Sequence, residues 1–264
     1  MIRKSLMLIY ALGAYALSMA ALVYIMGFLI DFGVPKGISG QSAMDDESLA
    51  LWPAILGNAG LIALFGLHHS ITARTSFKRW WTGIIPAPIE RATYLYMTVA
   101  MTALLVLFWQ PIPITIWHVE PRLAASFIYA GYAGIWTMMV AATFHFGHFG
   151  FLGLAQAWQN FRNTKPAPSN MTARYLYALV RHPISLGWML APFMTPHFTV
   201  GHLVFAGATF AYILLATPFE EADLIEEIGE PYRDYRDRVP TFVPFAKRRL
   251  FKAVPEHRSR PPGR

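Results

Sequence analysis

Residues 5–30 read SLMLIYALGAYALSMAALVYIMGFLI and contain no Lys, Arg, Asp or Glu. About 20 consecutive apolar residues are enough for an α-helix to cross the hydrocarbon core of a bilayer. Three further stretches are similarly apolar and free of charged side chains, at residues 51–72, 92–110 and 124–149. The sequence therefore predicts four membrane-spanning helices.

A fifth apolar region, residues 184–217, differs from these because Pro192 and Pro196 interrupt its first half. It is too long for one span and too short for two full spans, so we expect a hairpin of two short legs that turns near Pro196. The expected fold class is all-α, a polytopic membrane helix bundle of four spans, a C-terminal helical hairpin and a cytoplasmic amphipathic tail, with no strand. Residues 1–250 should form a single integral membrane domain, and residues 251–264 a basic, disordered tail.

The distribution of charge predicts the orientation of this bundle. Only 14% of the residues are charged, whereas about a quarter is usual in soluble domains, and the net charge is +7. With a cytoplasmic N-terminus, only Lys36 and Arg122 of the 22 Lys and Arg residues lie outside, which leaves 20 inside, as the positive-inside rule requires. We therefore expect an integral membrane protein of a bacterial inner membrane, with both termini cytoplasmic, in contact with membrane lipid and not with nucleic acid.

The chain contains no cysteine. This excludes disulfide bonds, thiolate metal sites and a cysteine nucleophile. Any thiol in the chemistry of the protein must therefore belong to a substrate.

Polar residues mark both ends of the predicted hairpin. Pro183 suits the first position of a helix, which places His182 at the N-cap and Arg181 directly before it. Because a hairpin brings its two ends together, Glu220 or Glu221 should return beside His182. The Arg181 guanidinium would then offer a fork for a ligand carboxylate. The alternative is that Arg181 is a positive-inside anchor and the two acids only favour a helix dipole.

Two tyrosines follow in the amphipathic tail. Residues 229–235 and 239–245 would lie over this site as a lid, with Tyr232 and Tyr235 covering an aromatic base or a sulfonium by stacking or cation–π contact. The alternative is that both tyrosines anchor the chain at the membrane interface.

Three histidines near the cytoplasmic leaflet are candidate functional residues, because ionisable groups within a membrane are costly. They are His69, His145 and His148. The last two are three residues apart and would share one helix face, from which they could ligate a metal or, with His69, a haem. No carboxylate is expected at the same depth in the membrane as these histidines, so we predict no metal site.

A run of small residues surrounds this pair. Gly147, Gly150 and Gly153 are three residues apart and would form one smooth stripe on a helix. Such a stripe permits either close helix packing or the approach of a ligand to the backbone.

Several of these motifs together resemble a known superfamily of membrane methyltransferases, which includes isoprenylcysteine carboxyl methyltransferase and the NnrU-like proteins. The resemblance rests on the order of rare elements between Tyr175 and Phe245. Within the superfamily, residues 65–70 and 90–94 and the Gly187-Trp188 pair resemble the methanethiol S-methyltransferases. The resemblance then spans nearly the whole chain. The elements between Tyr175 and Phe245 are Arg181-His182-Pro183, Gly187, Glu220-Glu221, Gly229, Tyr232, Tyr235 and Val239-Pro240.

The resemblance implies S-adenosyl-L-methionine as methyl donor and a small volatile thiol, methanethiol, as acceptor, which gives dimethyl sulfide. A neutral histidine on the acceptor side would take the thiol proton, and His69, His145 and His148 are implied there. Implied in donor binding are Gln156, Arg181, His182, Pro183, Gly187, Glu220, Glu221, Tyr232 and Tyr235.

The chain departs from the family pattern at two positions beside the expected site. Gly150 stands where the family usually has Asp, and Ala155 where it usually has Arg. Two other classes therefore stay open from the sequence. One is an NnrU-like membrane protein or reductase that methylates no thiol, and the other is a membrane protein with a bis-histidine haem.

Overall fold

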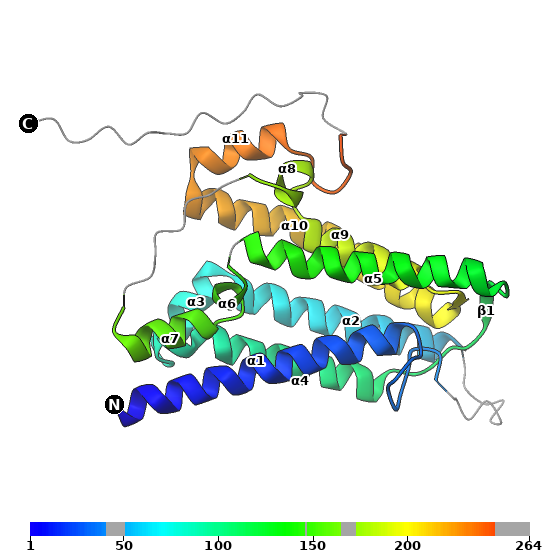
Figure 1. Ribbon diagram of the computed structural model, residues 1–264, viewed down its shortest axis with the longest axis horizontal. Coiled ribbons are helices and arrows are strands. Elements are labelled where there is room, and N and C mark those ends of the chain that lie inside the picture. Colours follow the sequence, from blue (N-terminus) through cyan, green and yellow to red (C-terminus); the bar gives the residue numbers. More distant parts are fainter. Residues whose placement is uncertain (41–50, 146, 165–172, 246–264) are drawn as a thin grey trace, which may run out of the picture.

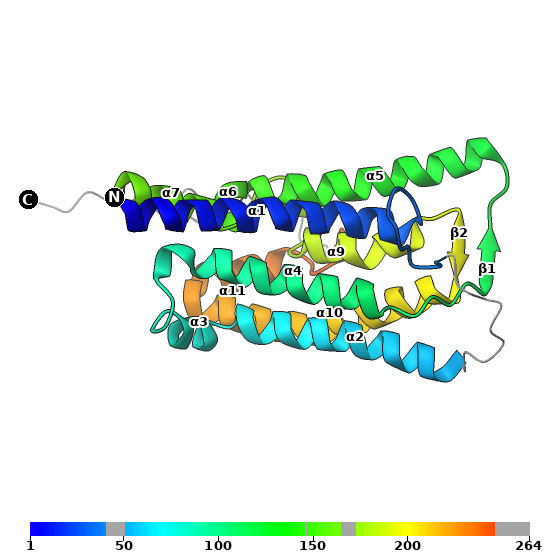
Figure 2. The same ribbon diagram turned by 90° about the horizontal axis from the view of Figure 1, so that it is seen from below.

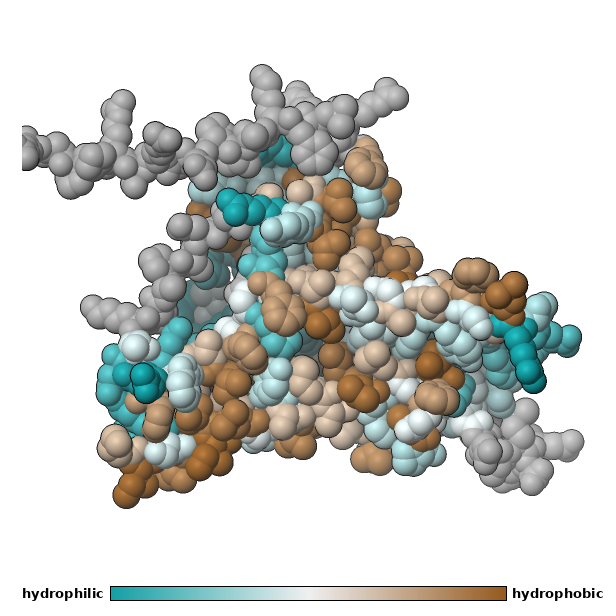
Figure 3. Space-filling view, in the orientation of Figure 1, coloured by the Kyte–Doolittle hydropathy of each residue, from teal (hydrophilic) through white to brown (hydrophobic). Residues whose placement is uncertain are grey.

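The computed structural model describes residues 1–40, 51–145, 147–164 and 173–245. Five helices in it are long and apolar enough to cross a membrane, and they run side by side along the long axis of the molecule (Figures 1 and 2). Hydrophilic residues gather towards the two ends of these helices (Figure 3). The protein is an all-α integral membrane protein, as the sequence predicts. The five helices are α1 (Ile2–Leu29), α2 (Leu51–Ala73), α4 (Glu90–Phe108), α5 (Arg122–His145) and α10 (Val200–Ile228).

Neighbouring helices in the bundle pack in the order α1, α4, α2, α10, α9 and α5. Aromatic side chains fill the core, where the Trp109 ring centroid lies 5.8 Å from both Phe28 and Phe205. The Trp109 indole N–H also donates to the Ile38 carbonyl at 3.0 Å. The buried indole is therefore satisfied, as a polar group in a core must be.

The hairpin is asymmetric. Its first leg is short, with α9 at Pro183–Leu190 continued by the 3-10 turn η2 at Ala191–Phe193. The prediction of a second short leg is wrong, because α10 runs for 29 residues through Pro218. A break there would expose several backbone groups, whereas one missing hydrogen bond is tolerated in a membrane helix. Gly229, with φ of 79°, ends α10.

The prediction that the chain has no strand is also wrong. Strand β1 (Thr115–His118) pairs antiparallel with β2 (His197–Thr199) at the end of the bundle opposite the N-terminus (Figure 1). The Trp117 and Phe198 rings stack across this pair at 3.8 Å. Such a pair is too short to give a sequence signal, and stacked aromatic side chains are what stabilise it.

Short helices gather at the N-terminal end of the bundle (Figure 1). Helix α7 packs against α1, and α11 packs against α10. The predicted disordered tail at 251–264 lies outside the described residues. The short elements are α3 (Thr75–Trp81), η1 (Ala87–Ile89), α6 (His148–Phe151), α7 (Leu154–Arg162), α8 (Leu176–Leu179) and α11 (Glu230–Arg238).

The predicted glycine stripe does not form. Gly147 and Gly153 have φ of 80° and 79°, a left-handed conformation that ends a helix. Helix α5 therefore stops at His145, and His148 belongs to the next element. The prediction that the two histidines share a helix face is wrong for the same reason.

Gly187 allows α9 to pack directly on α5. A Cβ atom built at Gly187 would overlap the side chain of Met139. We expect Gly187→Ala to lower the free energy of unfolding by about 1–3 kcal/mol, because overpacking forces neighbours apart. Thermal unfolding in detergent, followed by tryptophan fluorescence, measures this effect. The control is Gly134→Ala, where nothing lies within 4 Å of the new Cβ, and equal shifts in both variants would contradict the prediction.

Candidate functional site

The two ends of the hairpin meet at a buried carboxylate. His182 is the N-cap of α9 and precedes Pro183, while Glu221 lies near the end of α10. Glu221 Oε1 lies 2.7 Å from Arg181 Nε and 3.1 Å from His182 Nε2. All three residues are at most 8% exposed. The prediction that the hairpin returns a glutamate beside His182 is confirmed.

The side-chain N–H groups of Arg181 all point to acceptors within the protein. A guanidinium has five N–H donors. Nε and Nη2 point to Glu221, each at 2.7 Å, and Nη2 also donates to Thr241 Oγ1 at 2.7 Å. Nη1 donates to the carbonyl oxygens of Arg236, at 2.9 Å, and Val239. With all five donors directed at protein acceptors, Arg181 ties α9, α10 and α11 together.

The segment after α11 lies across the start of α9. The backbone N–H of Arg181 donates to the Pro240 carbonyl at 2.9 Å, and that of His182 to the Thr241 carbonyl at 3.3 Å. The Phe242 ring centroid lies 5.9 Å from that of His182. Residues 239–242 thus cover this end of the bundle, as expected of a lid.

Tyr232 and Tyr235 point into the protein from α11. They are 4% and 6% exposed, and their rings meet edge to face at 5.8 Å. The Tyr235 hydroxyl donates to the Tyr177 carbonyl at 2.7 Å. Burial raises the pKa of both phenols, so both stay protonated at neutral pH. Side chains so deeply buried do not act as interfacial anchors.

Glu220 is the open carboxylate of the site. Its side chain is 59% exposed, and Oε2 lies 3.7 Å from His182 Nδ1. Burial raises the pKa of the Tyr177 hydroxyl, and the nearby charge of Glu220 raises it further. The charge of Glu220 therefore influences phenols from four elements. The tyrosines within its electrostatic range are Tyr94 of α4, Tyr177 of α8, Tyr212 of α10 and Tyr232 of α11.

His69 and His145 each contact one of these tyrosines. His69 Nδ1 lies 2.7 Å from the Tyr94 hydroxyl. The His145 ring stacks on the Tyr177 ring at 4.8 Å. Each histidine is therefore joined to the surroundings of Glu220 through one tyrosine.

The remaining predicted site residues make other contacts. Both ring nitrogens of His148 are engaged, with the Tyr15 hydroxyl at 3.1 Å and Thr143 Oγ1 at 2.7 Å. Gln156 donates to the Gly150 carbonyl at 3.0 Å, and its buried Oε1 has no hydrogen-bond partner among the described residues. Within the described part of the chain, no three His, Asp or Glu side chains are grouped so that they could hold a metal ion.

Sequence reasoning gave no role to three residues that the structure places at the site. Tyr94 and Thr241 fell inside motifs already noted, but nothing distinguished them from their neighbours. Tyr177, four residues before Arg181, carried no signal, because its part depends on the stacking of His145 and on the lid helix.

Comparison with known proteins places the chain among close relatives. The chain matches no family model, and no solved structure matches it. It is 41% identical over 251 residues to methanethiol S-methyltransferase 2 of Bradyrhizobium diazoefficiens, covering 94% of this chain and 95% of that protein. It is 38% identical over 244 residues to methanethiol S-methyltransferase of Crocosphaera subtropica, covering 92% and 93%. A third relative of that name, from Pseudomonas deceptionensis, is 41% identical over 217 residues, covering 82% and 80%.

Proposed function

Because the chain belongs to the methanethiol S-methyltransferase family, we propose that it transfers a methyl group from S-adenosylmethionine to methanethiol, giving dimethyl sulfide. Two of these relatives cover more than nine tenths of the chain, so the proposal concerns the whole bundle as one domain, residues 1–250. The observation that carries it is Glu220, an exposed carboxylate beside His182 where the two ends of the hairpin meet.

The side chains around Glu220 fit such a donor. S-adenosylmethionine carries an ammonium and a sulfonium, and Glu220 offers the opposite charge because Glu221 is already held by Arg181 and His182. The aromatic ring of Phe242, beside His182, offers a surface on which the adenine base of the donor can stack. Away from Glu220, on α7, the buried Oε1 of Gln156 has no hydrogen-bond partner among the described residues and could accept from a ligand N–H.

The other residues assigned to the donor support this arrangement indirectly. Arg181 fixes Glu221 and the lid, Pro183 starts α9, and Gly187 brings that helix onto α5. Tyr232 and Tyr235 hold α11 in place by packing in a buried apolar cluster with residues of α10. We assign these five a positioning role.

The donor supplies an electrophilic methyl group, and the chain must align the acceptor sulfur and remove its proton. His69 takes the thiol proton at Nε2, since Nδ1 is engaged by the Tyr94 hydroxyl. His145, which stacks on Tyr177, also contributes to the acceptor side. His148 acts only in support, because Tyr15 and Thr143 occupy both of its nitrogens.

The site lies at the end of the bundle where the N-terminus and the short helices gather (Figure 1). Arg3, Lys4, Lys78 and Arg79 lie in helices at this end, α1 and α3. The positive-inside rule supports a cytoplasmic position for this end, and the bacterial origin of the relatives supports a bacterial inner membrane. A polar donor then arrives from the cytoplasm.

The experiment is a headspace measurement. Purified protein is sealed with methanethiol and S-adenosylmethionine whose methyl group is deuterated, and the vapour is analysed by mass spectrometry. Labelled dimethyl sulfide above a protein-free control is expected, and its absence would overturn the proposal. A Soret band in the absorption spectrum would instead identify a haem protein. Binding of a nicotinamide cofactor without binding of the donor would identify a reductase.

A further inference from the structure

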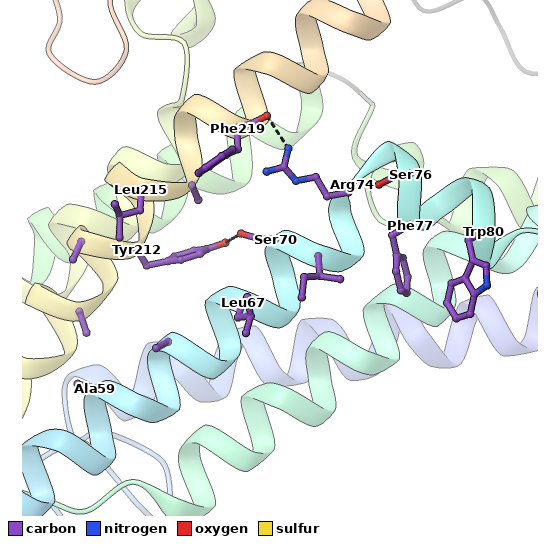
Figure 4. Close-up of a pocket in the computed structure, with 15 residues that line it drawn as sticks. Ala59, Leu67, Ser70, Arg74, Ser76, Phe77, Trp80, Tyr212, Leu215 and Phe219 are labelled. Atoms are coloured by element: carbon purple, nitrogen blue, oxygen red, sulfur yellow. Dashed lines mark hydrogen bonds between the residues drawn. The ribbon is translucent and has the colours of Figure 1, made fainter.

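A groove of about 940 Å³ runs between α2 and α10 (Figure 4). Alanines form much of its lining, and its rim carries Leu67, Trp80 and Leu215, which are exposed large apolar side chains. On a membrane-spanning helix pair, such a surface faces the hydrocarbon of the bilayer. The groove is therefore open to solutes dissolved in lipid.

Two polar contacts cross the groove between the helices (Figure 4). The Tyr212 hydroxyl lies 3.0 Å from Ser70 Oγ. Directly after the end of α2, Arg74 Nη1 donates to the Phe219 carbonyl at 3.1 Å and to Asp223 at 3.0 Å. The two contacts frame an opening between the helices.

The groove and the proposed site share this pair of helices. Ser70 lines the groove, and its neighbour His69 bonds Tyr94 on the site side. Phe219 lines the groove, and its neighbour Glu220 belongs to the site. Tyr212 lines the groove and lies within electrostatic range of Glu220. Successive helix residues point about 100° apart, so the groove and the site lie on two sides of one wall.

The ring of Tyr212 closes that wall against a bare stretch of α2. A Cβ atom built at Gly66 would overlap this ring, so the ring rests directly on the backbone. Its hydroxyl is held only by Ser70 among the contacts described. Tyr212 is therefore a rotatable part of this wall, held by one neutral hydrogen bond among the contacts described.

We propose that this groove is the lateral route by which the thiol acceptor passes from the bilayer to the site, with the Tyr212–Ser70 contact as its gate. The inference rests on the proposed function and extends it to the path of the acceptor. A small neutral thiol partitions into hydrocarbon and fits an alanine-rich groove, whereas a charged donor does not. Donor and acceptor thus reach the site from different phases.

The first test fills the groove. Ala63→Phe and Ala211→Phe place rings in it, and Ala133→Phe, exposed on α5 outside it, is the matched control. We expect the filled variants to raise the KM for methanethiol roughly tenfold, with unchanged KM for the donor, since only access of the acceptor is impaired. Unchanged KM for the thiol in both variants would overturn the inference.

The second test needs no turnover. Because the chain lacks cysteine, Tyr94→Cys provides a single thiol on the site side. A lipid-soluble alkyl methanethiosulfonate should label it in nanodiscs, and Ala63→Phe with Ala211→Phe should slow the labelling, while Ala133→Phe should not. His69→Cys serves if Tyr94→Cys fails to fold.

The outcomes separate the two proposals. Slowed labelling, together with failure of the unsubstituted chain to methylate methanethiol, would support the lateral route and defeat the proposed function. Equal labelling rates would overturn the route whatever the activity. Loss of a co-purifying phospholipid from the filled variants, with unchanged labelling, would assign the groove to a lipid and also overturn it.

Discussion

Glu221→Ala is expected to destabilise the end of the bundle by about 3–5 kcal/mol, because it removes one partner from a buried ion pair. Arg181 would lose the acceptor of two of its five donors, and His182 the partner of Nε2. These groups are almost fully shielded from water, so no solvent replaces the lost carboxylate. The tie between α9, α10 and the lid would loosen with it.

Thermal unfolding in detergent, followed through the eight tryptophans, measures this effect. Glu227→Ala, an exposed position on the same helix, is the matched control. Glu221→Gln keeps an acceptor for Arg181 and should fall between the two. If Glu221→Ala and Glu227→Ala unfold at the same temperature, the buried network does not stabilise this end of the bundle.

Glu220→Gln should have the opposite signature, with a large loss of donor affinity and unchanged stability. The side chain is 59% exposed and makes one long contact, at 3.7 Å, so the fold does not depend on it. Loss of one charge-assisted contact to a cation weakens binding by roughly tenfold to a hundredfold. Turnover at limiting donor should fall by the same factor.

Calorimetric titration with S-adenosylmethionine and with S-adenosylhomocysteine identifies which cation Glu220 faces. A carboxylate beside the ammonium would lose affinity for both ligands alike, whereas one beside the sulfonium would lose affinity chiefly for the first. Glu220→Asp, which keeps the charge, and Glu226→Gln, which removes an exposed charge elsewhere on α10, are the controls. Undiminished affinity in Glu220→Gln would remove this residue from the donor site.

The bilayer explains why the spans were predictable. A charge-free stretch of the required length has few alternatives to a helix in hydrocarbon. The end of α5 at His145 was not predictable, because residues 124–149 are uniformly apolar and no charge marks where the helix ends. Gly147 is compatible with a helix and with a left-handed turn, and the packing of α6 and α7 decides between them.

The candidate site was predictable as far as connectivity determines it. A hairpin must return the region of Glu221 to His182, whatever its details. Which of two adjacent glutamates turns inward depends on the rotation of α10, and no pattern in the sequence reports it. Two of the acceptors of Arg181 are the backbone carbonyls of Arg236 and Val239. Every residue type has such a carbonyl, so the sequence does not reveal these hydrogen bonds.

The five hydrogen bonds of Arg181 also order events during synthesis. Their acceptors lie 40 to 60 residues further along the chain, the last of them Thr241. A nascent chain can insert all five spans while this guanidinium still lacks the carbonyls of the lid. This end of the bundle then closes only after translation has passed residue 241. Until that moment the Arg181 guanidinium lacks the three acceptors that Arg236, Val239 and Thr241 provide.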